Sequence, residues 1–314
     1  MKNISILFPK SDFTSEQLQK LSFAGQVTFI ECGKEDGLEE MIKTCRGADI
    51  IAFPAEKLGK MATPWLLEIL EKVSTIKAVA LNTTHSYCVD RAYCIENEIT
   101  VTTVPDHSTE AVAEHIVGLL VATAKRIIIN DRRTYSRKYV PELGFNIRGK
   151  TLGIINVDGV GERVATIAKA FGMQVLLYNE APFRMEGTER QSLDEVLYKS
   201  DLLVLNLPNI KENELFLNKE RIGRLKDKAI VINMAGKELV DEKAMCKALI
   251  KGTVAQYVFE SLSMRRSPLE NIETAIRLKP FSKLTIDSLM MNREWVVKNV
   301  QGLSVGKPYN RVSL

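Results

Sequence analysis

The sequence predicts an α/β protein made of two doubly wound domains, each with a parallel sheet covered by helices. Two observations support this prediction. Short apolar runs alternate with helical patterns through residues 1–103. Residues 151–180 then have the pattern of a strand, a tight turn, a helix and a strand, and residues 152–157 form a run that is apolar except for Asn156. Such a run is typical of a parallel strand that is buried on both faces.

The first domain is predicted to be flavodoxin-like, because strands and helices alternate along it without a long interruption. The expected strands are residues 4–8, 27–30, 50–53, 76–81 and 100–103. The expected helices include residues 16–21, 38–43, 64–72 and 90–96. A final helix at 285–303 comes late enough in the chain to return to this domain.

The second domain is predicted to begin with one long helix from residue 108 to about residue 135. Ser108 or Thr109 is a plausible N-cap, and Glu110 lies in the positive first turn. Apolar residues cover much of the circumference of this helix, which favours burial between domains or subunits. Further strands are expected at 175–178, 202–207, 229–233, 254–259 and 276–278, and helices at 193–199, 220–225 and 242–250.

The strand–turn–helix unit after residue 151 has the layout of a dinucleotide-binding (Rossmann) domain. In such a domain a G-x-G-x-x-G turn lets the backbone approach a pyrophosphate at a helix N-terminus. Glycines are expected at 156, 158 and 161, but this chain has Asn156, Asp158 and Gly161. The acidic residue expected after the second strand is the amide Asn179. The turn therefore supports the fold more strongly than it supports cofactor binding.

Asn156 and Asp158 have a structural interpretation that we prefer to a binding role. Both residue types tolerate left-handed turns and can cap the helix that begins near Val160. Asp158 would then replace an anionic ligand with a carboxylate of the protein. If that carboxylate faced a pyrophosphate at about 4 Å, the repulsion would be about 4 kcal/mol at an effective dielectric constant near ~20. It would fall to about 1 kcal/mol if the side chain turned to solvent.

The composition is that of an ordinary globular protein, with 45% apolar and 26% charged residues. A net charge of +4 without dense basic runs argues against nucleic-acid binding. No apolar run approaches the roughly 20 residues of a membrane span, so we expect a cytoplasmic protein without a membrane partner. The five cysteines form no C-x-x-C pair, and the three histidines form no H-E-x-x-H motif, so no metal site is expected.

Seven segments together resemble the D-isomer-specific 2-hydroxyacid dehydrogenases, most closely the D-lactate dehydrogenase branch, over nearly the whole chain. They are VPDHSTEAVAEH at 104–115, LGFNIRGKTLGII at 143–155, KAFGMQVLLYN at 169–179, DLLVLNLP at 201–208, INMAGKELVDEKAM at 232–245, TVAQYVFE at 253–260 and GKPYNRV at 306–312. The resemblance implies a substrate domain of residues 1–101 and 290–314, a cofactor domain of residues 102–289, an active site in the cleft between them and a homodimer. The cofactor-binding residues that it implies are the degenerate loop of Asn156, Asp158, Gly159, Val160 and Gly161, with Asn179, Pro208 and Ala235.

The same resemblance implies three catalytic residues, and each is absent. The arginine that binds the substrate carboxylate corresponds to Gly236, the acid/base histidine to Phe281 and its orienting glutamate to Leu262. Phenylalanine and leucine transfer no protons. Loss of acid/base catalysis costs roughly 10² to 10⁴ in rate, and loss of a charged donor roughly 10² to 10³. Ordinary 2-hydroxyacid dehydrogenase activity is therefore not expected.

Other side chains could replace the missing groups if they line the cleft. The candidates are His107, His85 and Lys237, with Lys283 beside the missing histidine. They could serve as a relocated acid/base or bind a small anionic ligand. We prefer the alternative in which both histidines hydrogen-bond within their own loops and the lysines are solvated. His115 is expected to be a satisfied buried histidine or a helix-packing residue.

Three functions remain open at this point. The preferred one is a pseudoenzyme with a binding, scaffold or regulatory role and no expected cofactor. NAD(H) or NADP(H) would bind only if the degenerate loop still accommodates them. The second is a divergent NAD(P)-dependent oxidoreductase that acts on a small 2-hydroxy or 2-oxo acid, or another anionic substrate, with a relocated acid/base. The third is an interaction subunit that binds a protein partner through the long helix and the dimer surface.

Overall fold

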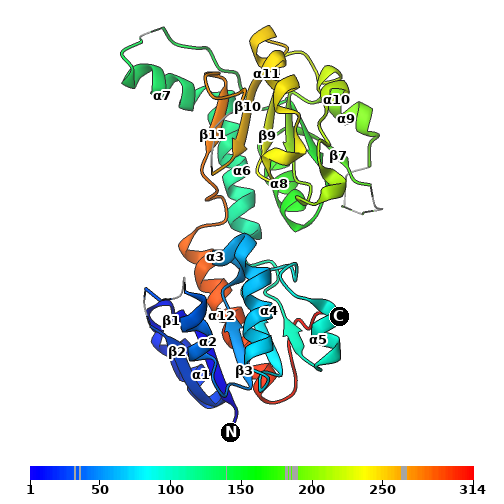
Figure 1. The fold of residues 1–314 in the computed structure, drawn as a ribbon. Coiled ribbons are helices and arrows are strands. Elements are labelled where there is room, and N and C mark those ends of the chain that lie inside the picture. The colour runs from blue at the N-terminus through cyan, green and yellow to red at the C-terminus, as the bar shows by residue number, and fades with distance from the viewer. Residues whose placement is uncertain are drawn as a thin grey trace. The chain divides into compact units, whose positions relative to one another are not determined.

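The computed structural model describes every residue except 32, 35–36, 139, 181–182, 184, 186–189 and 263–266. The chain divides into two compact units (Figure 1). Unit 1 comprises Met1–His107 and Ile286–Leu314, and unit 2 comprises Ser108–Thr285. The boundaries expected from the sequence lay after residue 101 and before residue 290. Within the described residues, no helix has both the length and the apolar character needed to cross a membrane.

Unit 1 is built on one five-stranded sheet in which every pair of neighbouring strands is parallel. The strand order is β2-β1-β3-β4-β5, which is the flavodoxin-like order. The strands are β1 (Asn3–Pro9), β2 (Gln26–Ile30), β3 (Ile50–Phe53), β4 (Ala78–Leu81) and β5 (Thr100–Thr102). The predicted fold class of this domain is confirmed.

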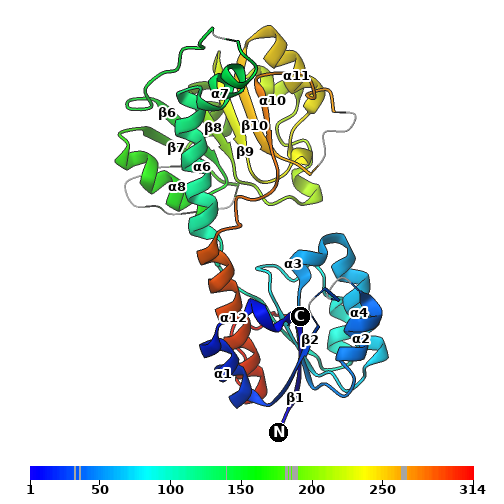
Figure 2. The ribbon, with the colours of Figure 1, turned by 90° about the vertical axis from the view of Figure 1, so that its left-hand side faces the viewer.

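Helices cover both faces of this sheet. They are α1 (Ser15–Ala24), α2 (Leu38–Thr44), α3 (Ala55–Leu58), α4 (Ala62–Lys72), α5 (Arg91–Glu96) and α12 (Ile286–Ser304), with short 3₁₀ turns η1 (Lys10–Asp12) and η2 (Gly59–Met61). One apolar core includes α2 and α4, and the other includes α1 and α12. Helix α12 lies against α1 (Figure 2). Its Asn292 and Asn299 side chains donate to the carbonyls of Asn82 and Thr103. The last helix therefore returns to the first domain, as predicted.

Unit 2 contains a six-stranded parallel sheet in the order β11-β10-β9-β8-β6-β7. The strands are β6 (Thr151–Ile155), β7 (Gln174–Tyr178), β8 (Leu202–Leu205), β9 (Ala229–Asn233), β10 (Val254–Glu260) and β11 (Ala275–Leu278). The strand order reverses between β6 and β8, and ligands of such sheets bind beyond the carboxyl ends of the strands at this point. The doubly wound Rossmann architecture is confirmed.

The helices of unit 2 pack on two faces of this sheet. They are α6 (Thr109–Ala124), α7 (Ile127–Tyr135), α8 (Gly159–Ala170), α9 (Leu193–Lys199), α10 (Lys219–Gly223) and α11 (Glu242–Lys251), with 3₁₀ turns η3 (Lys211–Asn213) and η4 (Lys237–Leu239). Helices α6 and α8 pack together in one core (Figure 2). Helices α9 and α11 contribute to the other core.

The single long helix predicted from residue 108 to about residue 135 is wrong, because it is two helices. Helix α6 ends at Ala124, and Arg126 adopts a left-handed conformation with φ 58° before α7 begins. Phe145 donates its N–H to the Ala124 carbonyl at 2.8 Å. Gly144 passes so close that a Cβ atom there would collide with the same carbonyl. A distant loop thus satisfies the end of α6, which local sequence does not reveal. Ser108 occupies the N-cap position without a side-chain capping bond.

Candidate functional site

The turn after β6 is closed by the side chain of Asp158. Its Oδ1 atom accepts hydrogen bonds from the N–H groups of Val160 at 2.9 Å and Gly161 at 3.1 Å. The amide Nδ2 of Asn206, which follows β8, donates to the same oxygen at 2.8 Å. Asp158 is the N-cap of α8, as predicted. Two of the free donors at the start of the helix, those of Val160 and Gly161, are therefore already occupied by a carboxylate of the protein.

Asn156 completes this turn and binds it to the neighbouring strand. Its φ of 69° lies in the left-handed region that the glycine of the fingerprint would adopt. The Asn156 side chain donates to the Asn206 carbonyl at 3.0 Å, and its own carbonyl accepts from Asn206 Nδ2 at 3.1 Å. A Cβ atom on Gly161 would lie 2.9 Å from that Asn156 carbonyl oxygen, so the retained glycine allows close packing. A Cβ atom on Gly159 would make only ordinary van der Waals contact, with Thr109 as its nearest neighbour.

These residues do not fit a dinucleotide in the conformation seen. A pyrophosphate at the N-terminus of α8 needs the N–H groups of Val160 and Gly161, which Asp158 occupies. It would also face the Asp158 carboxylate, a like charge. Asn179 directly follows β7 and offers an amide in place of the ribose-binding carboxylate. Pro208 is exposed after β8, and Ala235 is half-buried after β9.

The loop after β9 is built around glycine at position 236. Its φ is 150°, and a Cβ atom there would lie 2.5 Å from Nδ2 of Asn209. Asn233 holds the loop: its Oδ1 accepts from the N–H groups of Ala235 and Gly236 at 3.1 and 3.2 Å. Its Nδ2 donates to the Gly236 carbonyl at 2.7 Å. A side chain at 236 therefore requires the Asn209 side chain to move and holds the backbone in a conformation that favours glycine. Lys237, half-buried, begins η4 directly afterwards.

Glu260, at the end of β10, holds the segment in which the family histidine is expected. Its Oε1 accepts from the N–H groups of Phe281 at 3.0 Å and Ser282 at 2.8 Å, and its Oε2 accepts from the Ser282 hydroxyl at 3.1 Å. Leu262 is 83% exposed. No proton-transferring side chain therefore stands at either family position. Glu260 was missed in the sequence, although its place at a strand end was a usable signal.

Phe281 packs edge-to-face on His115 of α6, with ring centroids 5.1 Å apart. The two residues line a groove of about 450 Å³. Burial lowers the pKa of His115, while the charge of Glu260 opposes the shift. The Nε2 atom of His115 is buried without a hydrogen-bond partner among the described residues. His115 was expected to be either a buried histidine with its hydrogen bonds satisfied or a helix-packing residue. The contact with Phe281 and the unpartnered Nε2 agree with the second expectation.

The two histidines proposed as substitutes both lie in unit 1, in different environments. His85 is exposed, and its backbone N–H faces Thr83 Oγ1 at 3.4 Å. His107 is only 7% exposed, and its Nε2 lies 3.7 Å from Oε1 of Glu56, on α3. The preferred interpretation expected His107 to hydrogen-bond within its own loop. The structure instead places its side chain beside Glu56, outside that loop. Glu56 follows the end of β3 closely, a signal that sequence reasoning overlooked.

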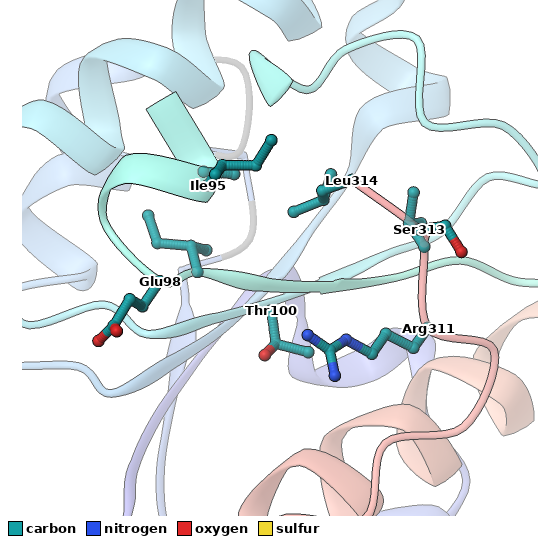
Figure 3. Close-up of a pocket in the computed structure, with 9 residues that line it drawn as sticks. Ile95, Glu98, Thr100, Arg311, Ser313 and Leu314 are labelled. Atoms are coloured by element: carbon teal, nitrogen blue, oxygen red, sulfur yellow. The ribbon is translucent and has the colours of Figure 1, made fainter. Parts of the chain in front are cut away.

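Unit 1 contains a cavity of about 730 Å³ beside α5, β5 and the C-terminal segment (Figure 3). Thr100, at the amino end of β5, and Arg311 are among its lining residues. Ligands of parallel sheets favour the carboxyl ends of strands, so this position is the less favoured one. Cys94 also lines the cavity, and burial raises its pKa to about 11, so it remains a thiol at neutral pH. No cluster of three potential metal ligands occurs among the residues that the structure describes.

Comparison with known proteins identifies the relatives of this chain. Residues 117–278 match the model of the D-isomer specific 2-hydroxyacid dehydrogenase, NAD binding domain. The chain is 32% identical over 232 residues to a glyoxylate reductase of Thermococcus kodakarensis, covering 69% of this chain and 67% of that protein. It is 28% identical over 291 residues to a glycerate dehydrogenase of Methylorubrum extorquens, covering 87% and 88%.

Solved structures support the same two-domain α/β fold. The apo-structure of D-lactate dehydrogenase from Escherichia coli aligns with a TM-score of 0.77 at 25% identity and covers 100% of both chains. An acyclic imino acid reductase, solved in complex with NADPH and D-Arg, aligns with a TM-score of 0.82 at 24% identity. That alignment covers 99% of this chain and 100% of the other.

Proposed function

The chain belongs to the D-isomer-specific 2-hydroxyacid dehydrogenase family, and from that membership we propose that it is a catalytically degenerate member. It would keep both α/β domains and serve a binding, scaffold or regulatory role without nicotinamide redox chemistry. The positions of the three family catalytic residues support this proposal. They hold Gly236, Leu262 and Phe281, and none of these side chains can bind a carboxylate or move a proton.

The observation that carries the proposal is the self-capped turn of unit 2. Asp158 accepts from both N–H groups that a pyrophosphate would need, and Asn206 fixes the carboxylate from the neighbouring strand. A bound dinucleotide would have to displace this carboxylate or tolerate its charge. The repulsion of about 4 kcal/mol for a facing pair corresponds to nearly three decades in affinity.

A second function is an NAD(P)-dependent oxidoreductase that acts on a small 2-hydroxy or 2-oxo acid. The names of the relatives favour it, because they include glyoxylate reductase and glycerate dehydrogenase. It requires Asp158 to leave the start of α8, and it requires an acid/base other than the family histidine. The two functions make opposite predictions for cofactor binding.

Calorimetric titration with NADH and NADPH tests the proposal. We expect no saturable binding to the wild-type protein, because Asp158 occupies the donors. Asp158→Gly, which frees them, should bind NADH, with a gain of up to about 10³ in affinity. Asp158→Asn keeps a capping oxygen without the charge and should show an intermediate gain.

The matched control is Asp241→Gly, which removes the N-cap of α11 in the same unit. It should lose a similar capping energy, on the order of a few tenths of a kcal/mol, and gain no NADH affinity. Circular dichroism verifies that each variant is folded. Micromolar binding of NADH to the wild-type protein would contradict the proposal and leave the oxidoreductase as the function.

A further inference from the structure

A cavity of about 730 Å³ in unit 1 lies away from the edge at which doubly wound sheets bind their ligands. That edge is formed by the carboxyl ends of the strands, whereas the cavity adjoins Thr100, the first residue of β5. Its walls come from two distant parts of the chain, within residues 94–100 and 311–314. All of these residues belong to unit 1, so the cavity involves neither the turn after β6 nor the positions of the family catalytic residues.

The C-terminal wall of the cavity is fixed along the outer edge of β5. This strand is last in the strand order of its sheet, so its outer edge is free to pair with another segment. Arg311 pairs with Thr102 in an antiparallel bridge, and the Val312 N–H donates to the Val101 carbonyl at 2.9 Å. The segment therefore extends the sheet and holds the Arg311 backbone in place.

The polar side chains of the cavity lie on one side of it. Successive residues of an extended chain point to opposite faces of a sheet, and partners across an antiparallel pair point to the same face. Arg311 is opposite Thr102 and therefore shares a face with Thr100. Figure 3 shows the Glu98, Thr100 and Arg311 side chains along one side of the cavity, with Thr100 between the two charged groups in this view. These three residues form a polar wall that carries both signs of charge.

Apolar side chains form the opposite wall. Ile95 and Leu314 lie across the cavity from the polar wall in the same view (Figure 3). Leu314 packs on the apolar core to which the buried Cys94 and Ile99 belong. Ile95 is 58% exposed, so its side chain has apolar surface available to a ligand. The cavity thus places a charged wall opposite an apolar one.

Glu98 and Arg311 carry opposite charges that the described part of the chain does not pair. Both residues are exposed, they form no ion pair with each other, and neither forms one with another described residue. A ligand with a single charge would be attracted by one of these groups and repelled by the other. A ligand with a positive and a negative group engages both in charge-assisted hydrogen bonds. The two charges therefore favour a zwitterion.

We propose that this cavity binds an apolar α-amino acid as its zwitterion. The Arg311 guanidinium binds the carboxylate, the Glu98 carboxylate binds the ammonium group, and the wall of Ile95 and Leu314 covers the apolar side chain. Exposed charges attract only weakly, so burial of the apolar side chain has to contribute part of the affinity. The inference goes beyond the proposed function and does not depend on it, because every lining residue that the structure describes belongs to unit 1.

Three ligands that share an isobutyl group test the requirement for both charges. Leucine carries both charged groups, 4-methylpentanoate only the carboxylate and 3-methylbutylamine only the ammonium group. In calorimetric titrations of the full chain we expect saturable binding of leucine, and binding at least about 10-fold weaker for each of the other two. With ¹³C-labelled isoleucine methyl groups, leucine should shift the signals of Ile95 and Ile99, which Ile95→Val and Ile99→Val assign.

Removing one charge at a time should change which ligand binds. Glu98→Gln and Arg311→Gln should each weaken leucine binding about 10-fold. Glu98→Gln also removes the repulsion of a carboxylate, so it should bind 4-methylpentanoate more tightly than the wild-type protein does. Arg311→Gln should in the same way gain affinity for 3-methylbutylamine. Glu96→Gln, at an exposed residue of α5 outside the cavity, is the matched control and should leave all three affinities unchanged.

Four outcomes would overturn this inference. They are no saturable binding of leucine, equal affinity for the three ligands, binding that leaves the Ile95 and Ile99 signals in place, and unchanged affinities in both charge variants. Circular dichroism verifies that the variants are folded, which is expected because both substituted residues are exposed. No nicotinamide enters these titrations, so their failure is distinct from failure of the cofactor titration.

Discussion

At the scale of single residues, the three positions at which the resemblance implies catalytic groups differ in how they are held by the local structure. The Gly236 backbone adopts a φ of 150° and lies against the Asn209 side chain, so a side chain there would be strained and would displace Asn209. Phe281 is anchored through its N–H to Glu260 and packs on His115. Leu262 is largely exposed and contributes little.

Gly236→Ala should lower the free energy of unfolding by about 1–3 kcal/mol. The added Cβ atom would lie 2.5 Å from Asn209 Nδ2, and the backbone conformation is unfavourable for alanine. Urea denaturation followed by circular dichroism measures the difference. Gly223→Ala is the control, because no atom would lie within 4 Å of its Cβ, and its stability should be unchanged or slightly raised. Equal stability of both variants would contradict the structure of this loop.

At the scale of secondary-structure elements, α6 ends earlier than the sequence predicts, and it contains a histidine with a buried ring nitrogen. The helix ends at Ala124 because Gly144 and Phe145 take its terminal carbonyl. Its His115 packs against Phe281 with Nε2 buried and unpartnered among the described residues. Burial lowers the pKa of His115 in the folded protein. The unfolded chain therefore takes up the proton first as the pH falls, and this favours unfolding.

Stability should consequently decrease as the pH falls below the ordinary histidine value of 6.5. The contribution of His115 is fully present above that value and is lost progressively toward the lower pKa of the folded state. His115→Gln has no titrating ring and should show a shallower decrease between about pH 7 and pH 5. His85→Gln, which removes an exposed histidine, should keep the wild-type profile. Urea unfolding at several pH values measures the free energy of unfolding. The same pH dependence of this free energy in His115→Gln and wild type would refute the prediction.

At the scale of the whole molecule, unit 2 exposes apolar side chains that do not pack into its own core. Tyr135, Val140 and Leu143 are 93%, 75% and 86% exposed. They lie at the end of α7 and in the segment that follows it. Exposed apolar groups that occur together favour a protein–protein contact. We propose that this segment contributes to a homodimer.

The mass in solution should therefore be that of a dimer, twice the 35.2 kDa of the chain. Leu143→Asp places a charge in the proposed contact and should shift the protein toward the monomer mass. Tyr198→Asp alters an exposed aromatic residue of α9, 72% exposed, and should leave the dimer intact. Size-exclusion chromatography with light scattering distinguishes these outcomes. A monomeric wild-type protein would disprove the proposed contact.

The sequence by itself determined the two parallel sheets, nearly all of their strands and the capping of α8 by Asp158. These features depend on residues a few positions apart, so apolar runs and turn residues are enough to predict them. Only the tertiary structure joined Asp158 to Asn206, set Gly236 against Asn209, ended α6 at Ala124 and brought Glu56 to His107. Each of these contacts connects distant parts of the chain. Their formation depends on how the strands and loops pack, which no local pattern records.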